Sequence, residues 1–381
     1  MIHHGLSVAG SACAALLVSI PLLAQAPPEL RLTRDLRIDA AEQDLSPVGW
    51  VTVAPNGIIV VSQPQDGLLR FFDARGSTLG TFGRMGRGPG EFADPSRSAW
   101  IDDTLWVADF NTRRFTLVAP DRTLIRTVPY VQAVTLAAPG GEAPHITSVF
   151  ARSLLSGGRQ LATVNLADDS PWPGGRRSTQ PLVRIDSAGA LQNMVVWHPG
   201  RASCMVSARM GGGFMSSVIP FCAAPLDDVS PDGARYALVE VAGAGGSYRV
   251  SVFRPTGDTI SSRTYSYTPV RIPKAVADSV IARRIGRQTG QAAEMWRSAK
   301  LPANYPPLAR VLLGRDETVW VERYSIAGDR EWLMLDARGN VAGRLVLSRN
   351  VVLQAVSREM LWATGTDSDG LQHIIRYRVS R

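Results

Sequence analysis

The sequence contains few of the residues that build metal centres and many catalytic sites. Its 381 residues include three cysteines and five histidines, too few for the repeated Cys and His pairs of zinc modules. It also lacks a G-x-S-x-G nucleophile elbow and a Walker phosphate-binding sequence. No constellation of residues in the sequence therefore points to a particular reaction, and no metal ligands or cofactor can be assigned.

Lysine is nearly absent. Lys274 and Lys300 are the only lysines among the 41 basic residues, and the excess of these bases over 33 acidic residues gives a net charge of +8. A basic balance can indicate a nucleic-acid surface, but these arginines are scattered along the chain in runs no longer than two. We therefore expect a solvated basic surface that attracts anionic components of the cell envelope, and we do not expect nucleic-acid binding.

An apolar, uncharged run occurs only at the N-terminus. Residues 6–23 form this run, and the small-x-small sequence Ala24-Gln25-Ala26 follows. The pattern predicts a signal peptide over residues 1–26, with an uncleaved N-terminal anchor as the alternative because the segment before the run lacks Lys and Arg. Cleavage would leave residues 27–381, without a transmembrane segment, in the periplasm or outside the cell.

Two cysteines, Cys204 and Cys222, remain after cleavage. In an oxidising compartment they could form a disulfide. Their spacing alone does not fix the geometry, so two buried thiols that never meet are the alternative.

A polar turn followed by a short apolar strand recurs six times along the chain. The pattern is clear at Asn56-Gly57 before residues 58–61 and at Asp316-Glu317 before residues 319–321. Tryptophan occupies nearly the same strand position in three of the six units, as Trp106, Trp320 and Trp362. Recurrence of one β-rich unit is typical of repeat architectures.

A second turn completes each unit. The sequence Asp-Ala-Arg-Gly follows a strand at residues 73–76 and again at residues 336–339, where Asp and Gly suit a tight turn. Each unit therefore reads as four strands, the content of one propeller blade. We predict an all-β, six-bladed β-propeller, in which each sheet covers the apolar face of the next.

The last unit supplies only three strands before the chain ends. Residues 30–38, LRLTRDLRI, alternate apolar and polar side chains and precede the first blade. We predict that the segment 27–40 closes the ring by adding a strand to the sixth blade; the alternative is a flexible leader.

One segment departs from the β pattern. Residues 274–299 place Val276, Val280, Ile281 and Ile285 at helical spacing between Pro273 and Pro302. This predicts a helical insertion between the fourth and fifth blades, as one helix or two. It could pack over the propeller edge or form a lid over the central opening.

Residues 82–95 read FGRMGRGPGEFADP and resemble the G-x-x-G-x-G-P-G-E-F-x-x-P linker of NHL repeats. Residues 106–117, WVADFNTRRFTL, resemble the strand that follows the linker in that family. The likeness covers residues 48–128, about two blades, and implies the propeller fold. Asn111 lies one position nearer to Asp109 than the family pattern has it.

The loops around this linker supply the candidate ligand residues. In a propeller the linkers between blades share one face with the loops between second and third strands. We expect that face to gather polar side chains of the first two blades: Gln63, Asp66, Arg84, Arg87, Glu91, Asp94, Asp109, Asn111 and Arg113. Glu91 has a structural alternative, as a partner for backbone amides.

Two functions follow from this architecture. The first is an exported binding module, without catalysis, for a protein, peptide or glycan of the cell envelope. The second is a hydrolase or lactonase with a divalent cation at the axis. Gluconolactonase-like propellers keep the second function open, since their cation is held by Glu, Asp and Asn oxygens that come from separate blades.

Overall fold

The computed structural model describes residues 26–45, 47–134, 144–168, 170–172, 175, 178, 180–242 and 246–381. The signal segment expected over residues 1–26 lies, except for Ala26, outside these residues. Within the described ranges, no helix has both the length and the apolar character needed to cross a membrane.

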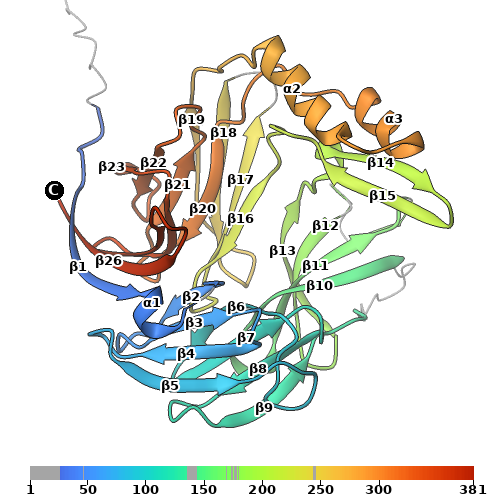
Figure 1. Cartoon of the computed structure of the whole chain (residues 1–381). Helices are drawn as coiled ribbons and strands as arrows, with labels where there is room; N and C mark the ends of the chain where they lie inside the picture. Colours follow the sequence, from blue (N-terminus) through green and yellow to red (C-terminus); the bar gives the residue numbers. More distant parts are fainter. Residues whose placement is uncertain are drawn as a thin grey trace, which may run out of the picture.

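Six four-stranded antiparallel sheets stand around a common centre and form a six-bladed β-propeller, as expected (Figure 1). The first blade comprises β2 (Val51–Val53), β3 (Ile59–Gln63), β4 (Leu68–Phe72) and β5 (Thr78–Gly83). The second comprises β6 (Pro95–Ile101), β7 (Thr104–Asp109), β8 (Arg114–Val118) and β9 (Leu124–Pro129). The third comprises β10 (Ile146–Leu154), β11 (Gln160–Leu166), β12 (Gln180–Ile185) and β13 (Leu191–His198).

The remaining blades follow the same order. The fourth comprises β16 (Leu226–Val229), β17 (Tyr236–Ala242), β18 (Ser247–Phe253) and β19 (Thr259–Ser266). The fifth comprises β20 (Leu308–Leu313), β21 (Val319–Arg323), β22 (Arg330–Leu335) and β23 (Val341–Leu347). The sixth contains β24 (Val351–Val356), β25 (Met360–Thr366) and β26 (Gln372–Ser380), together with β1 (Arg31–Asp39) from the start of the chain.

The repeated Asp-Ala-Arg-Gly turns explain the sharp reversals within the first and fifth blades. Asp73 Oδ1 accepts hydrogen bonds from the backbone N–H groups of Arg75 and Ser77, both at 2.8 Å. Asp336 Oδ1 makes the same two bonds, to Arg338 at 2.9 Å and Asn340 at 2.8 Å. One carboxylate thus satisfies the donors that the turn leaves free.

The cores lie between neighbouring blades. Trp320 and Trp332 of the fifth blade are fully buried in a cluster with Leu353 and Leu361 of the sixth. Similar clusters join the other blades, so each sheet buries its apolar face against the next. This arrangement stabilises sheets that could not bury both faces alone.

Strand β1 completes the sixth blade. It pairs antiparallel with β26, with Arg31 opposite Ser380 and Asp39 opposite His373. Asp35 accepts hydrogen bonds from Arg376 Nε at 2.7 Å and Arg378 Nε at 2.6 Å. The first and last strands of the described chain are therefore joined by both backbone and side-chain bonds.

Two insertions extend the linkers on either side of the fourth blade. The hairpin of β14 (Met205–Met210) and β15 (Gly213–Val218) precedes this blade, and a disulfide joins Cys204 to Cys222 around it, with Cα atoms 5.5 Å apart. Helices α2 (Lys274–Ile285) and α3 (Gly290–Ser298) follow the blade and lie beside the hairpin (Figure 1).

The two helices differ in burial. Helix α2, which carries the apolar residues at helical spacing, has no buried residue. Helix α3 instead buries Ala293, Met295 and Trp296, and its closest strand is β14. The insertion therefore packs on the hairpin through α3.

Candidate functional site

The two ends of the strands define two faces of the propeller. The turns between first and second strands and between third and fourth strands lie at one end, which we call the turn face. Linkers between blades and loops between second and third strands lie at the other end, the linker face.

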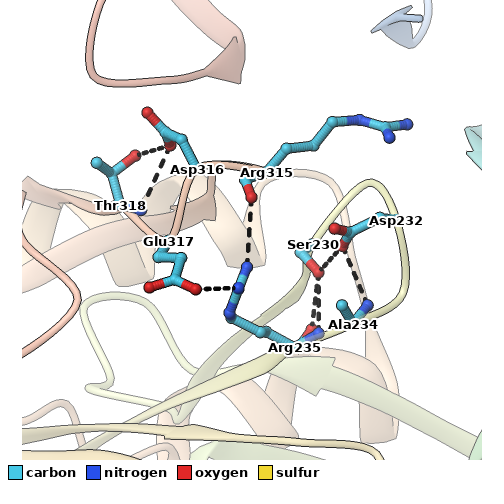
Figure 2. Close-up of polar contacts among 8 residues, drawn as sticks. All are labelled: Ser230, Asp232, Ala234, Arg235, Arg315, Asp316, Glu317 and Thr318. Atoms are coloured by element: carbon cyan, nitrogen blue, oxygen red, sulfur yellow. Dashed lines mark hydrogen bonds and ion pairs between the residues drawn. The ribbon is translucent and has the colours of Figure 1, made fainter. Parts of the chain in front are cut away.

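Figure 2 shows one cluster of polar groups on the turn face that bind one another. Between the fourth and fifth blades, Arg235 donates to Glu317 Oε1 at 2.5 Å and to the Arg315 carbonyl oxygen at 3.3 Å. The side chain of Arg315 points away from this group, and its Nη2 lies 3.4 Å from the carbonyl oxygen of Trp100 in β6. These contacts connect separate blades and give this part of the turn face a structural role.

On the linker face, the connection between the first two blades is held by Glu91. Its carboxylate accepts hydrogen bonds from the Gly88 N–H at 2.7 Å and from Arg84 Nε at 2.9 Å. The bond from the Gly88 amide, followed by that from Arg84, lowers the pKa of Glu91 below its usual value. The linker bends around this side chain. This contact agrees with the structural alternative for Glu91, in which its carboxylate bonds backbone amides.

Arg114 and Asp109 fasten the same linker to the second blade. Arg114 donates to the carbonyl oxygens of Arg87 at 2.8 Å and Glu91 at 2.9 Å. Buried Asp109 accepts from the N–H groups of Ala93 at 2.8 Å and Thr112 at 2.9 Å. Asn111, which is displaced from the NHL pattern, has no bond with either residue among the described contacts.

Phe92 and Gly67 explain why the linker fits so closely. The Phe92 ring is fully buried between the first two blades. Gly67 has φ of +63°, and a Cβ there would lie 2.5 Å from the Met85 Cα. Gly67 therefore lets the linker backbone approach the first blade closely.

Gln63 and Asp66 also have internal partners. Gln63 is fully buried; its Oε1 accepts from Arg70 Nε, and its Nε2 lies 3.3 Å from Asp66 Oδ2. Arg70 in turn donates to Asp44 Oδ2 at 2.9 Å. These groups join the first blade to the segment that follows β1.

The other candidates are available to a ligand. Arg87, Asn111 and Arg113 are exposed, and Asp94 is half-buried. None of these four side chains has a hydrogen bond or ion pair in the described part of the chain. They lie on the linker face, and none of them lines a cavity described for this structure. A binding site at these four residues therefore stays a prediction.

An arginine–aspartate pair joins inner strands near the axis, where it lines a small cavity. Arg97 of β6 forms an ion pair with Asp228 of β16 and lies 5.3 Å from the centre of the Trp50 ring. The other carboxylate oxygen of Asp228 accepts from the Leu313 N–H at 2.9 Å. The described residues contain no group of three His, Cys, Asp or Glu side chains that could hold a metal ion. Both carboxylate oxygens of Asp228 therefore already have partners, Arg97 and the backbone of Leu313.

An aromatic cleft of about 200 Å³ opens on the linker face between the fourth and fifth blades. Four tyrosines line it, namely Tyr248, Tyr267, Tyr305 and Tyr324. Tyr305 and Tyr324 stack with ring centres 5.3 Å apart, and Phe221 packs edge-on against Tyr305 at 5.1 Å. We call this group the aromatic cleft.

Backbone hydrogen bonds fix the segments that carry three of the four tyrosines of the aromatic cleft. The N–H groups of Tyr267, Tyr305 and Tyr324 donate to backbone carbonyl oxygens at 2.8, 2.9 and 3.1 Å. Burial raises the pKa of Tyr248 to about 12, so its hydroxyl stays protonated near neutral pH. The cleft could not be predicted from the sequence, because its rings come from separate blades and linkers.

The comparisons with known proteins concern the fold. No protein-family model and no curated protein matches the sequence, so the resemblance to NHL repeats stays a prediction. A member of the DUF4221 family from Bacteroides vulgatus is similar in structure, with 12% identity, a TM-score of 0.50, and coverage of 93% of this chain and 100% of that one.

Two further structures show weaker likeness. A Bacteroides fragilis protein thought to be exported has 11% identity and a TM-score of 0.47, over 92% of this chain and 96% of that one. A virginiamycin B lyase from Staphylococcus aureus has 12% identity and a TM-score of 0.42, over 92% and 99%. At such identities, likeness extends to the fold alone: the chain is a six-bladed β-propeller.

Proposed function

We propose that this protein is a binding module that holds a sugar ring of an envelope glycan in the aromatic cleft. The observation that carries the proposal is the convergence of four tyrosine rings on one cavity of the linker face. Binding at this face agrees with the sequence-based hypothesis, but the site lies between the fourth and fifth blades instead of the first and second.

The chemistry of the cleft suits a sugar better than a purely apolar group. Aromatic faces pack against the C–H faces of a sugar ring, while tyrosine hydroxyls can bond its hydroxyl groups. Tyr267 and Tyr324 are only half-buried, so their rings remain accessible. Arg323 lines the same cavity and adds a charged donor at its edge.

The rings are also arranged before a ligand arrives. Tyr324 stacks on Tyr305, and backbone bonds fix both residues. A rigid aromatic surface loses little conformational entropy on binding, so more of the contact energy appears as affinity.

The expected cellular setting matches an envelope ligand. The disulfide between Cys204 and Cys222 would persist in an oxidising compartment. The apolar N-terminal segment favours export. We therefore place the protein in the periplasm or outside the cell, where glycans are the ligands that the cleft meets.

The test is a binding screen with the purified protein against neutral oligosaccharides and against peptides. We expect an oligosaccharide to bind, Tyr324→Ala to weaken its affinity about fivefold, and Tyr324→Phe to retain most of it, since a stacked ring contributes about 1 kcal/mol.

Phe110→Ala is the matched control, because Phe110 is an aromatic that is 54% exposed and lies on the linker face of the second blade. It should leave oligosaccharide binding unchanged. Binding that responds to Phe110→Ala and not to Tyr324→Ala, or binding of peptides alone, would overturn the proposal.

A further inference from the structure

A second cavity, of about 290 Å³, lies at the linker-face ends of the third and fourth blades. Its polar lining includes Arg152 of β10, His198 of β13 and Asp227 of β16, with Arg201 at its rim. None of these residues lines the aromatic cleft. We call this space the arginine cavity.

The histidine in the arginine cavity is a neutral donor. Its Nδ1 accepts a hydrogen bond from the Gly200 N–H at 2.9 Å, so the ring proton sits on Nε2. Burial, with the nearby Arg152 and Arg201 charges, lowers the pKa of His198 to about 4. Near neutral pH the imidazole is therefore uncharged and presents one N–H.

That N–H has no hydrogen-bond partner among the described residues. His198 Nε2 is buried and lies 3.8 Å from Asp227 Oδ1, which is too far for a hydrogen bond. Only 7% of the His198 side chain is exposed. A buried donor without a partner is costly, and it calls for a bound acceptor.

The charges of the arginine cavity favour an oxyanion. Arg152 forms an ion pair with Asp227, yet its buried Nε has no hydrogen-bond partner among the described residues. Exposed Arg201 adds a second positive charge at the rim, and none of the described contacts pairs its guanidinium. Two guanidinium groups thus stand against one carboxylate, and guanidinium geometry matches that of a bound carboxylate.

The cavity also offers an acceptor for a hydroxyl group. Asn165 Nδ2 donates to Ser148 Oγ at 2.9 Å, whereas the buried Asn165 Oδ1 is unpaired. Donors for a carboxylate and an acceptor for a hydroxyl therefore share one space, a combination that suits a hydroxylated acid.

We infer that the arginine cavity binds the carboxylate of a uronic-acid residue, so that the glycan recognised by this protein is acidic. This inference rests on the proposed glycan-binding function, but it depends on different residues. Arg201 would bind the carboxylate, His198 Nε2 would donate to one of its oxygens, and Asn165 Oδ1 would accept from a sugar hydroxyl.

Calorimetric titration of the purified protein with glucuronate and galacturonate tests the inference. At least one should bind, and Arg201→Gln should weaken it about tenfold, the value of one charge-assisted hydrogen bond. His198→Asn should also weaken it, since asparagine can keep the bond to the Gly200 N–H but lacks the Nε2 donor. The control Arg126→Gln alters an exposed arginine on β9, the outer strand of the second blade, and should change nothing.

Other outcomes are equally informative. Unchanged uronate binding in Arg201→Gln overturns the inference, as does binding of inorganic phosphate or sulfate with equal affinity, which would indicate a general anion site. Uronate binding that depends on Arg201, in a protein whose oligosaccharide binding does not respond to Tyr324→Ala, contradicts the proposed function of the aromatic cleft and leaves the carboxylate site standing.

Discussion

The linker between the first two blades and the linkers around the fourth blade use polar residues in opposite ways. In residues 84–94, Glu91, Arg114 and Asp109 satisfy the backbone of the linker. Beside the fourth blade, His198 Nε2 and Arg152 Nε are buried without partners. The polar side chains around the first linker mainly bond its backbone, although Arg114 Nε there is also buried without a partner among the described residues. Those beside the fourth blade border a cavity. In the linker that resembles an NHL repeat, the polar residues therefore mainly hold the backbone.

The largest expected effect separates the two regions by stability. Phe92→Ala removes a fully buried ring between the first two blades and should lower the free energy of unfolding by about 3–5 kcal/mol. Oligosaccharide affinity should hardly change at a temperature where the variant is folded. Urea denaturation and calorimetry measure the two quantities. Phe214→Ala, at a side chain that is 77% exposed, should affect neither, and a ligand-binding loss in Phe92→Ala alone would break the comparison.

A pH series sharpens the comparison further. The pKa of His198 falls from 6.5 to about 4 on folding, so the unfolded chain binds its proton first as pH falls. The neutral histidine contributes stability above pH 6.5, and this contribution is lost between pH 6.5 and about 4, amounting to at most about 3 kcal/mol.

Denaturation at pH 7.5 and pH 5 checks this expectation. His198→Asn should reduce the loss of stability at the lower pH. Part of the loss should remain, because burial also lowers the pKa of His373. Glu91→Gln should leave the loss unchanged, because the pKa of Glu91 lies below 4.5 and its stabilising effect disappears only in stronger acid. An unaltered pH slope in His198→Asn contradicts the assignment of His198 as a buried neutral group.

The smallest effect concerns the residues that the sequence favoured. Arg84→Glu with Arg87→Glu should change the free energy of unfolding by about 1 kcal/mol or less, because Arg84 is 80% exposed in its pair with Glu91. Binding of glycans should persist. Loss of an envelope partner in a pulldown with this double variant would instead restore the first linker as the binding site.

Much of the fold could be predicted from the sequence because it depends on local, repeated chemistry. Asp73 and Asp336 begin identical turns, and the alternating segment before the first blade pairs as β1. Such patterns reflect side chains that face a sheet core or a turn backbone, and a short window of sequence contains them.

The candidate sites depend instead on neighbours that are distant in the chain. Tyr248 and Tyr324 meet only because two blades stand side by side. His198 is one of three histidines in residues 27–381. Its neighbours in the sequence do not predict that Arg152 and Asp227 lie beside it. Conversely, Glu91 looked available because the sequence does not show that Gly88 and Arg84 turn back onto it.

The pairing of β1 with β26 makes closure of the ring depend on strands that are far apart in the sequence. Strand β1, with Arg31, must meet β26, with Ser380, before the ring can close. Contacts so remote in sequence form slowly, and until they form the edge of β26 stays open to other chains. Shortening β1 or β26 would therefore reopen the ring and leave an unpaired sheet edge.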